Sequence, residues 1–259
     1  MKIRFVGTCA RDYSPLLQTV FKDSLDKDAR RSSCALVDGH ILIDCGHHTL
    51  DSLRIQQILP ETIDILLLTH LHDDHYQPDS IRTIAAAAER TLQVYAQANA
   101  VPELAEALAG ANVEIIGLSF LEKIRIGEET FVSALPANHT RFPAHYLIEI
   151  EGKKLFYATD GAWIMYDTLY YLWGQNVDMV VFDATCGDYE GDFRVAEHNS
   201  IRMIRSMCRS LKKLNVYKKD AKLYLTHSAP SLHKSHEETA EKVRKSKLLV
   251  AYDGLEEEI

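Results

Sequence analysis

The sequence ILLLTHLHDDH at positions 65–75 joins a short apolar run to three histidines and two aspartates. The apolar run is typical of a buried strand. In an extended segment, residues two positions apart face the same way, so His70 and His72 can hold one metal ion together. Asp74 and His75 then turn towards a second ion. The stretch therefore predicts a metal site at the end of a strand.

Other expected strands also end close to a residue that can bind metal. They lead to His139, to Asp160 and to His227. Open α/β sheets place their ligands at the carboxyl ends of strands, where loops distant in sequence converge. We therefore expect these three side chains to meet the histidines of the first motif.

The distribution of apolar residues predicts the fold class. Runs typical of strands occur at residues 3–6, 35–37, 41–43, 63–68, 91–95, 113–116, 131–134, 146–150, 154–157, 179–182 and 222–225. Helical periodicity occurs at residues 79–89, 101–108, 199–214 and 236–245. Gly127 and residues 151–152 stand between apolar runs, as hairpin turns do. We expect one α/β domain over residues 1–259, built of two β-rich halves that meet near residue 120.

Residues 10–33 differ from the rest of the chain, because they are polar, charged and weakly periodic. They predict a long surface loop or insertion. Loops of this length are often functional. A lid over the site and a plain surface decoration are both consistent with the pattern.

Composition excludes several classes of protein. The chain has 259 residues, of which 46% are hydrophobic and 25% charged, which excludes disorder and leaves ample material for a core. With a net charge of −8, the protein lacks the overall positive field that attracts proteins to nucleic acid, so a nucleic-acid partner is not expected. The lysine-rich runs 212–213, 218–219 and 242–247 predict solvated faces.

The sequence shows no membrane-spanning run and no paired-cysteine motif, and both observations bear on where the protein is located. No apolar run reaches the roughly 18–20 residues needed to cross a bilayer, so we expect a cytoplasmic protein without a membrane partner. The five cysteines include no C-x-x-C pair, so we expect neither a disulfide framework nor a cysteine zinc knuckle.

The string THLHDDH at 69–75, followed by His139, Asp160 and His227, resembles the metallo-β-lactamase superfamily of binuclear hydrolases. The resemblance implies a four-layer αββα sandwich with a two-metal site at one edge of the paired sheets. It implies that one divalent ion takes His70, His72 and His139, that a second takes Asp74, His75 and His227, and that Asp160 bridges both. A ligand set rich in histidine favours zinc, with manganese or iron as alternatives.

The substrate class can be narrowed within the superfamily. Asp160 stands where β-lactamases of this fold typically have cysteine, and His72 stands where flavo-di-iron relatives usually have glutamate. Hydrolysis of thioesters or lactones and hydrolysis of phosphodiesters therefore stay open. His198, at the start of the expected helix 199–214, resembles the phosphodiesterase branch, represented by ribonuclease Z and phosphoribosyl cyclic phosphate phosphodiesterase. In that branch a histidine at this place contacts the scissile phosphate and protonates the leaving oxygen.

The expected activity is hydrolysis of a small or cyclic phosphodiester by a metal-bridging hydroxide, with His198 and Asp74 in catalytic roles. Asp44 and Asp183 are expected to orient metal-binding histidines, because such imidazoles usually donate their other N–H to a carboxylate or carbonyl.

We expect a small anionic substrate, since the sequence shows no protruding arm of the kind that binds RNA in ribonuclease Z. A homodimer is also possible on this sequence. The alternatives are a thioesterase or lactonase of the same fold, and a tRNA 3′-processing nuclease similar to ribonuclease Z. Of the other histidines, His48 and His145 are the strongest candidates for a role at the site.

Overall fold

A computed structural model describes residues 1–189 and 192–259 and places their strands in two seven-stranded sheets. The first sheet has the order β14-β1-β2-β3-β4-β5-β6, and the second has the order β13-β12-β11-β10-β9-β8-β7. The first contains β1 (Lys2–Gly7), β2 (Cys34–Val37), β3 (Ile41–Ile43), β4 (Ile65–Leu67), β5 (Leu92–Gln97), β6 (Val113–Leu118) and β14 (Glu256–Glu258). The second contains β7 (Lys123–Gly127), β8 (Thr130–Pro136), β9 (Ala144–Ile150), β10 (Lys153–Ala158), β11 (Val177–Asp183), β12 (Tyr217–Thr226) and β13 (Leu248–Val250).

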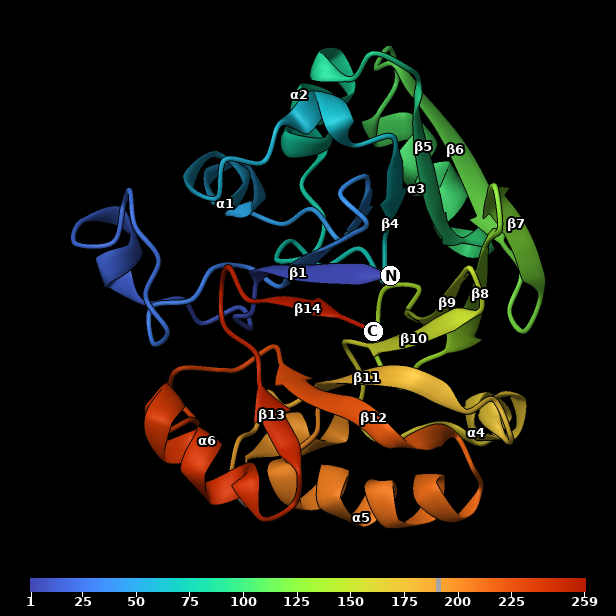
Figure 1. Cartoon of the computed structure of the whole chain (residues 1–259). Helices are drawn as coiled ribbons and strands as arrows, with labels where there is room; N and C mark the ends of the chain where they lie inside the picture. Colours follow the sequence, from blue (N-terminus) through green and yellow to red (C-terminus); the bar gives the residue numbers. More distant parts are fainter. Residues whose placement is uncertain (190–191) are drawn as a thin grey trace.

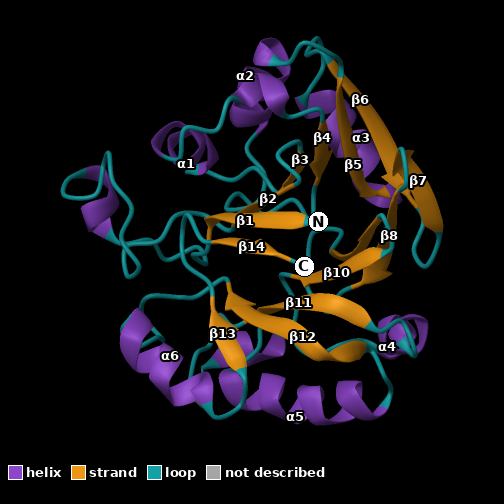
Figure 2. Ribbon diagram, viewed as in Figure 1, coloured by secondary structure: helices purple, strands orange, loops and turns teal. Residues whose placement is uncertain are grey.

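Helices cover the outer face of each sheet (Figures 1 and 2). The first sheet carries α1 (Thr49–Ile55), α2 (Pro78–Ala87) and α3 (Val101–Ala107), and the second carries α4 (Tyr166–Leu172), α5 (Ile201–Lys213) and α6 (His236–Arg244). A central apolar cluster joins residues of both sheets, and a further cluster lies between each sheet and its helices. The predicted αββα sandwich is confirmed, and its halves meet between β6 and β7.

The strands are apolar on both faces because each sheet packs against two layers. In β3, Ile41 and Ile43 enter the central cluster, whereas Leu42 between them packs under the helices. In β9, Tyr146 and Leu147 divide in the same way. Successive side chains of a strand point to opposite faces, so a strand buried on both sides appears in sequence as a continuous apolar run.

Both sheets combine antiparallel and parallel pairs, and this places many strand ends at one edge. Strands β3 to β6 are parallel, as are β10 to β13. The hairpins expected at Gly127 and at residues 151–152 join β7 to β8 and β9 to β10. Glu151 and Gly152 have φ values of 50° and 77°, which a tight hairpin turn requires.

Helix α5 shows how the sequence sets a helix boundary next to the site. Its buried side chains are Ile201, Ile204, Met207 and Leu211, a spacing that lines one face of a helix. The Ser200 hydroxyl accepts a hydrogen bond from the Met203 N–H and caps the first turn, so the helix begins two residues after the expected start.

Residues 10–33 contain the short 3-10 helix η1 (Pro15–Gln18) and extend away from the sheets in Figure 1. Arg30 and Arg31 anchor the end of this segment: Arg30 Nη1 donates to the Ala251 carbonyl at 2.7 Å, and the Arg31 N–H donates to Asp253 Oδ2 at 2.8 Å.

Among the described residues, no helix has the length and apolar character needed to span a membrane.

Candidate metal centre

The structure brings all seven predicted metal ligands together at the carboxyl edge of the sheets. His70, His72, Asp74 and His75 follow β4, while His139 follows β8, Asp160 follows β10 and His227 follows β12. His70 and His72 point towards the same place, and the chain then turns at Asp74 and His75. Strand β4 ends at Leu67, and the His75 and Tyr76 N–H groups both donate to the His72 carbonyl in a tight turn. The turn still directs the side chains inward.

Three histidines form the first group of candidate ligands. His70 Nε2 lies 3.0 Å from His72 Nδ1, and His139 Nε2 lies 3.1 Å from the same nitrogen. Asp160 Oδ2 is 3.6 Å from His70 Nε2 and 3.7 Å from His139 Nε2. The geometry agrees with the expected ligand set of one ion.

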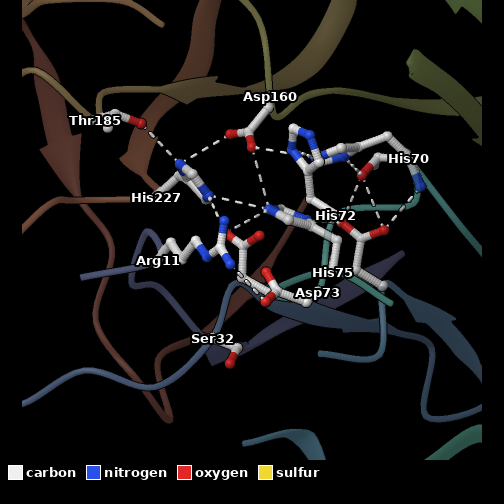
Figure 3. Close-up of polar contacts among 12 residues, drawn as sticks. Arg11, Ser32, His70, His72, Asp73, His75, Asp160, Thr185 and His227 are labelled. Carbon is white, nitrogen blue, oxygen red and sulfur yellow. Dashed lines mark hydrogen bonds and ion pairs between the residues drawn. The ribbon is translucent and has the colours of Figure 1, made fainter. Parts of the chain in front are cut away.

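The second group consists of Asp74, His75, Asp160 and His227, all of them buried. His75 Nε2 lies 3.0 Å from His227 Nε2, and Asp74 Oδ2 lies 3.4 Å from each of these nitrogens. Asp160 Oδ2 is 3.2 Å from His75 Nε2. The same oxygen therefore faces both groups, as the expected bridge between two ions requires (Figure 3).

A buried aspartate and a threonine orient the histidines of the first sheet. Asp44 Oδ2 accepts from His75 Nδ1 at 2.7 Å. The Thr69 hydroxyl lies 2.8 Å from Asp44 Oδ2 and 3.1 Å from His70 Nδ1. A hydroxyl that donates its proton to the carboxylate must accept from His70. Both imidazoles then carry their proton on Nδ1, which leaves the lone pairs of Nε2 facing the site.

The second sheet repeats this arrangement around Asp183. The Thr185 hydroxyl donates to Asp183 Oδ1 at 2.7 Å and lies 2.7 Å from His227 Nδ1. Asp183 Oδ2 lies 2.8 Å from Nδ1 of His198. Each buried aspartate thus contacts one histidine directly and a second through a threonine hydroxyl. The orienting roles expected of Asp44 and Asp183 agree with this geometry.

Burial and charge set the protonation of the two groups. Burial lowers the pKa of His70, His72 and His139, so these imidazoles stay neutral. Burial opposes ionisation of Asp74 and Asp160, but the neighbouring histidines outweigh it and hold the pKa of both carboxyls low.

The second group favours positive charge. Burial lowers the pKa of His227, but Asp160 and Asp74 outweigh it and raise that pKa to about 10. The pKa of His75 is raised in the same way, chiefly by Asp74 and Asp44. A divalent cation can take the place of these protons, because carboxylates and imidazole nitrogens are its usual ligands. The residues therefore fit the metal ions that the sequence implies.

His198 lies beside both groups on the wall of a cavity of about 390 Å³. Burial lowers its pKa, but Asp183 and Asp160 outweigh burial and raise it. Asp183 contacts its Nδ1, and no hydrogen bond to its Nε2 is found within residues 1–189 and 192–259. Segment 10–33 contributes Ala10, Arg11 and Asp12 to the same wall.

The other candidate histidines have supporting positions. His145 is buried, and its Nε2 donates to the Asp160 carbonyl at 3.0 Å, which helps to hold the bridging residue. His48 contacts the Ser32 hydroxyl through Nδ1 at 3.0 Å and does not line the cavity. The five cysteines are free thiols, as expected.

Thr69 and Thr185 are the site residues that the sequence interpretation missed. Each follows a strand of the parallel part of its sheet, and each neighbours a residue already assigned to the site. The sequence could have indicated these residues only by their positions, directly before His70 and two residues after Asp183. Threonine is also common in strands for its shape alone, so the signal is weak.

Comparison with known proteins agrees with this architecture. A family model described as "Beta-lactamase superfamily domain" matches residues 40–228. A diphosphatase of the PhnP family has a crystal structure with a TM-score of 0.76 at 22% identity, and the match covers 100% of this chain and 97% of that one. Zinc-bound PqqB from Methylobacterium extorquens gives a TM-score of 0.76 at 16% identity, with 100% of each chain covered.

Human short-form tRNase Z gives a TM-score of 0.71 at 19% identity, covering 100% of this chain and 99% of that one. A comparison with curated proteins found no match. These structural likenesses establish the fold. The family match and the two ligand groups together support a metal-dependent hydrolase. The family model covers well over half of the sequence, so the chain belongs to the β-lactamase superfamily.

Proposed function

We propose that the protein is a binuclear metal-dependent phosphodiesterase that acts on a small or cyclic phosphodiester. The observation that carries the proposal is the position of His198. Its Nδ1 is held by Asp183 at 2.8 Å, and it shares the cavity wall with His72, His139 and His227 from both ligand groups. A proton donor beside a two-metal site is the arrangement that a phosphodiester leaving group needs.

Two divalent ions would be held by the ligand groups described above, with zinc favoured by the imidazole donors. Bound ions of this kind lower the pKa of water and neutralise charge that develops on a phosphoryl group. Asp160 would contact both ions, and Asp44 and Asp183 would keep the imidazoles aligned for them.

In the proposed reaction an oxygen of water forms a bond to phosphorus while the bond to the leaving oxygen breaks. Asp74 is ionised and would orient the attacking water. Bound divalent ions would lower the pKa of that water, so its proton passes to solvent. Asp183 and Asp160 raise the pKa of His198 against the effect of burial, which favours its protonated form. It donates that proton to the leaving oxygen, so the alkoxide does not depart as an anion.

The shape and charge of the cavity favour a small anionic substrate. A volume of about 390 Å³ lies at the small end of the range for ligand sites. Two divalent ions in the ligand groups would supply positive charge on its wall, where Arg11 and Arg194 also stand, paired with Asp73 and Asp192. A phosphodiester carries the negative charge that such ions would attract, whereas a thioester or lactone group does not.

The test is an assay of the zinc-reconstituted protein on bis(p-nitrophenyl) phosphate, with the cyclic phosphodiester adenosine 2′,3′-cyclic phosphate as a second substrate whose product is measured by chromatography. Thioesters, lactones and a precursor tRNA are assayed beside them to separate the alternatives. We expect phosphodiester turnover to exceed the others. On the cyclic nucleotide, whose leaving alkoxide needs a proton, His198→Ala should lower kcat by roughly 10²–10⁴-fold, the usual contribution of a general acid, while the metal content stays unchanged.

His48→Ala is the matched control, because His48 lies outside the cavity wall and should leave kcat unchanged. Turnover of thioesters or lactones that exceeds phosphodiester turnover contradicts the proposal. A His198→Ala variant with wild-type kcat on the cyclic nucleotide removes the role assigned to that residue.

A further inference from the structure

Charge is distributed very unevenly along this acidic chain. Residues 202–247 contain 13 of the 29 Lys and Arg residues but only 4 of the 37 Asp and Glu residues. This segment therefore has a net charge of +9 and the rest of the chain a net charge of −17. It forms α5, β12, α6 and their connections, so the excess positive charge gathers on the layer at the bottom of Figure 1.

Part of this positive charge surrounds a groove of about 400 Å³ at the C-terminal half of α5. The walls carry five basic side chains, and the lining includes no Asp or Glu: Arg205, Arg209, Lys212, Lys219 and Lys247. Apolar side chains from the adjoining strands, Leu223 and Leu248, also line the groove, and both are buried. The ring of Tyr217 lies beside them, fixed by a hydrogen bond from its hydroxyl to the Cys208 carbonyl at 3.0 Å.

The groove cations differ from the basic residues around them. Nearby, Lys218 pairs with Asp178 at 2.6 Å, and Lys242 pairs with Asp188 at 2.6 Å. No such ion pair is found for Lys212, Lys219 or Lys247 within the part of the chain that the structure describes. Like charges that face one concave surface repel each other, and a bound anion would relieve that repulsion.

Arg205 adds an unsatisfied donor to the groove. Its Nη2 donates to the Lys242 carbonyl at 2.9 Å, which holds the guanidinium in place. Its Nε is buried, and no hydrogen-bond partner for it is found in residues 1–189 and 192–259. The contact to Lys242 holds the positive charge of Arg205 on the groove wall, beside that of Arg209.

We propose that this groove is a nucleotide-binding site, distinct from the metal centre. The cations would take two or more phosphate groups, and the apolar lining beside the Tyr217 ring would take the flat base. A volume of about 400 Å³ suits a ligand of this size. The same chemistry occurs in a free nucleotide and in one unit of a single strand, so the experiment includes both.

The groove and the catalytic cavity share no lining residue. Helix α5 begins at Ile201 next to His198 and reaches Arg209 eight residues later, which is about 12 Å along the helix axis. Substitutions in the groove should therefore leave the hydrolytic activity unchanged.

The test measures binding of adenosine triphosphate, inorganic triphosphate and a single-stranded decanucleotide to the full chain by calorimetry. In the variant Arg209→Gln/Lys212→Gln/Lys219→Gln we expect binding of adenosine triphosphate to weaken at least tenfold, with a smaller dependence on salt. The variant Arg90→Gln/Arg125→Gln/Lys153→Gln removes the same charge from exposed positions elsewhere and should bind within twofold of wild type. Asp160→Ala should also retain binding, which separates the groove from the metal centre.

The conservative variant Lys212→Arg/Lys219→Arg keeps the charge and should keep the affinity, so a loss caused by misfolding is recognised. Tighter binding of adenosine triphosphate identifies a free nucleotide as the ligand, and tighter binding of the decanucleotide identifies a strand. Equal affinity of the groove variant and wild type overturns the proposal. So does inorganic triphosphate that binds as tightly as adenosine triphosphate, because the apolar lining would then contribute nothing.

Discussion

Thr185 offers a direct test of how the protein orients its metal-binding histidines. Its hydroxyl contacts Asp183 Oδ1 at 2.7 Å, His227 Nδ1 at 2.7 Å and His198 Nδ1 at 3.1 Å. Thr185→Val keeps the shape of the side chain and removes all three contacts. The Asp183 carboxylate keeps the hydrogen bond from the Thr185 backbone N–H at 2.8 Å, so the loss falls mainly on the two histidines.

The expected magnitude follows from these contacts. Without the hydroxyl, the nearest remaining acceptor for His227 Nδ1 is Asp160 Oδ1 at 2.8 Å, and a ring that turns towards it no longer presents Nε2 correctly. Removing an orienting partner of this kind typically costs about 10–100-fold in metal affinity. The lost buried hydrogen bonds should also lower the free energy of unfolding by about 1–3 kcal/mol.

The assay is competition for zinc against a chromogenic chelator, with the thermal unfolding of the metal-free protein measured in parallel. Thr185→Ser keeps the hydroxyl and should restore most of the affinity. Thr168→Val is the matched control, because Thr168 is buried and its hydroxyl donates to the Pro136 carbonyl at 2.6 Å, away from the ligand groups. It should lower stability without changing zinc affinity. A Thr185→Val protein that binds zinc as tightly as wild type would refute the orienting role.

Three further outcomes follow from the structure. Phe156→Ala should lower the free energy of unfolding by about 3–5 kcal/mol in urea titrations, because Phe156 is fully buried between the second sheet and its helices. Burial raises the pKa of Asp253 to about 6 from 3.8, so the folded protein keeps a proton that the unfolded chain loses as pH rises through this window. Stability should therefore fall by up to about 3 kcal/mol between roughly pH 4 and pH 6, relative to Asp253→Asn, in unfolding curves collected across that range. Chelation of the metal should abolish hydrolysis and lower the melting temperature of the loaded protein, since ions that bind the folded state stabilise it.

The fold could be predicted wherever local pattern and tertiary environment agree. Strands buried on both faces, such as β11, appear as unbroken apolar runs, and helix α5 shows its buried face in the spacing of Ile201, Ile204 and Met207. The short helices α1 and α4 were missed. Each has seven residues, and their sequences, TLDSLRI and YDTLYYL, contain few strong helix formers, so packing decides their structure.

The three missed strands, β7, β13 and β14, all stand at sheet edges. Strand β14 consists of three glutamates and has no apolar pattern. It forms because β1 offers a free edge, and Lys2 and Arg4 on that strand pair with Glu256. Strand β7 is also an edge strand, with exposed Lys123 and Arg125. Such strands are specified by their neighbours more than by their own residues.

The ligand groups could be predicted because their residues stand next to strand ends, and a sheet brings strand ends together. The contacts of Thr69 and Thr185 could not, because they depend on side-chain directions that only the assembled strands fix. Asp44 and Asp183 have the same kind of surroundings, each with a threonine hydroxyl in contact with its carboxylate. The two arrangements lie on different sheets, so no spacing in the sequence could predict them.

Residues from both halves of the chain are proposed to hold two metal ions, with Asp160 between them. The most direct test is the metal content of the zinc-reconstituted wild type and of Asp160→Ala, measured by inductively coupled plasma mass spectrometry. The account predicts two ions per wild-type chain and at most one in the variant. A wild-type chain that retains fewer than one ion, or a variant that still retains two, would contradict it.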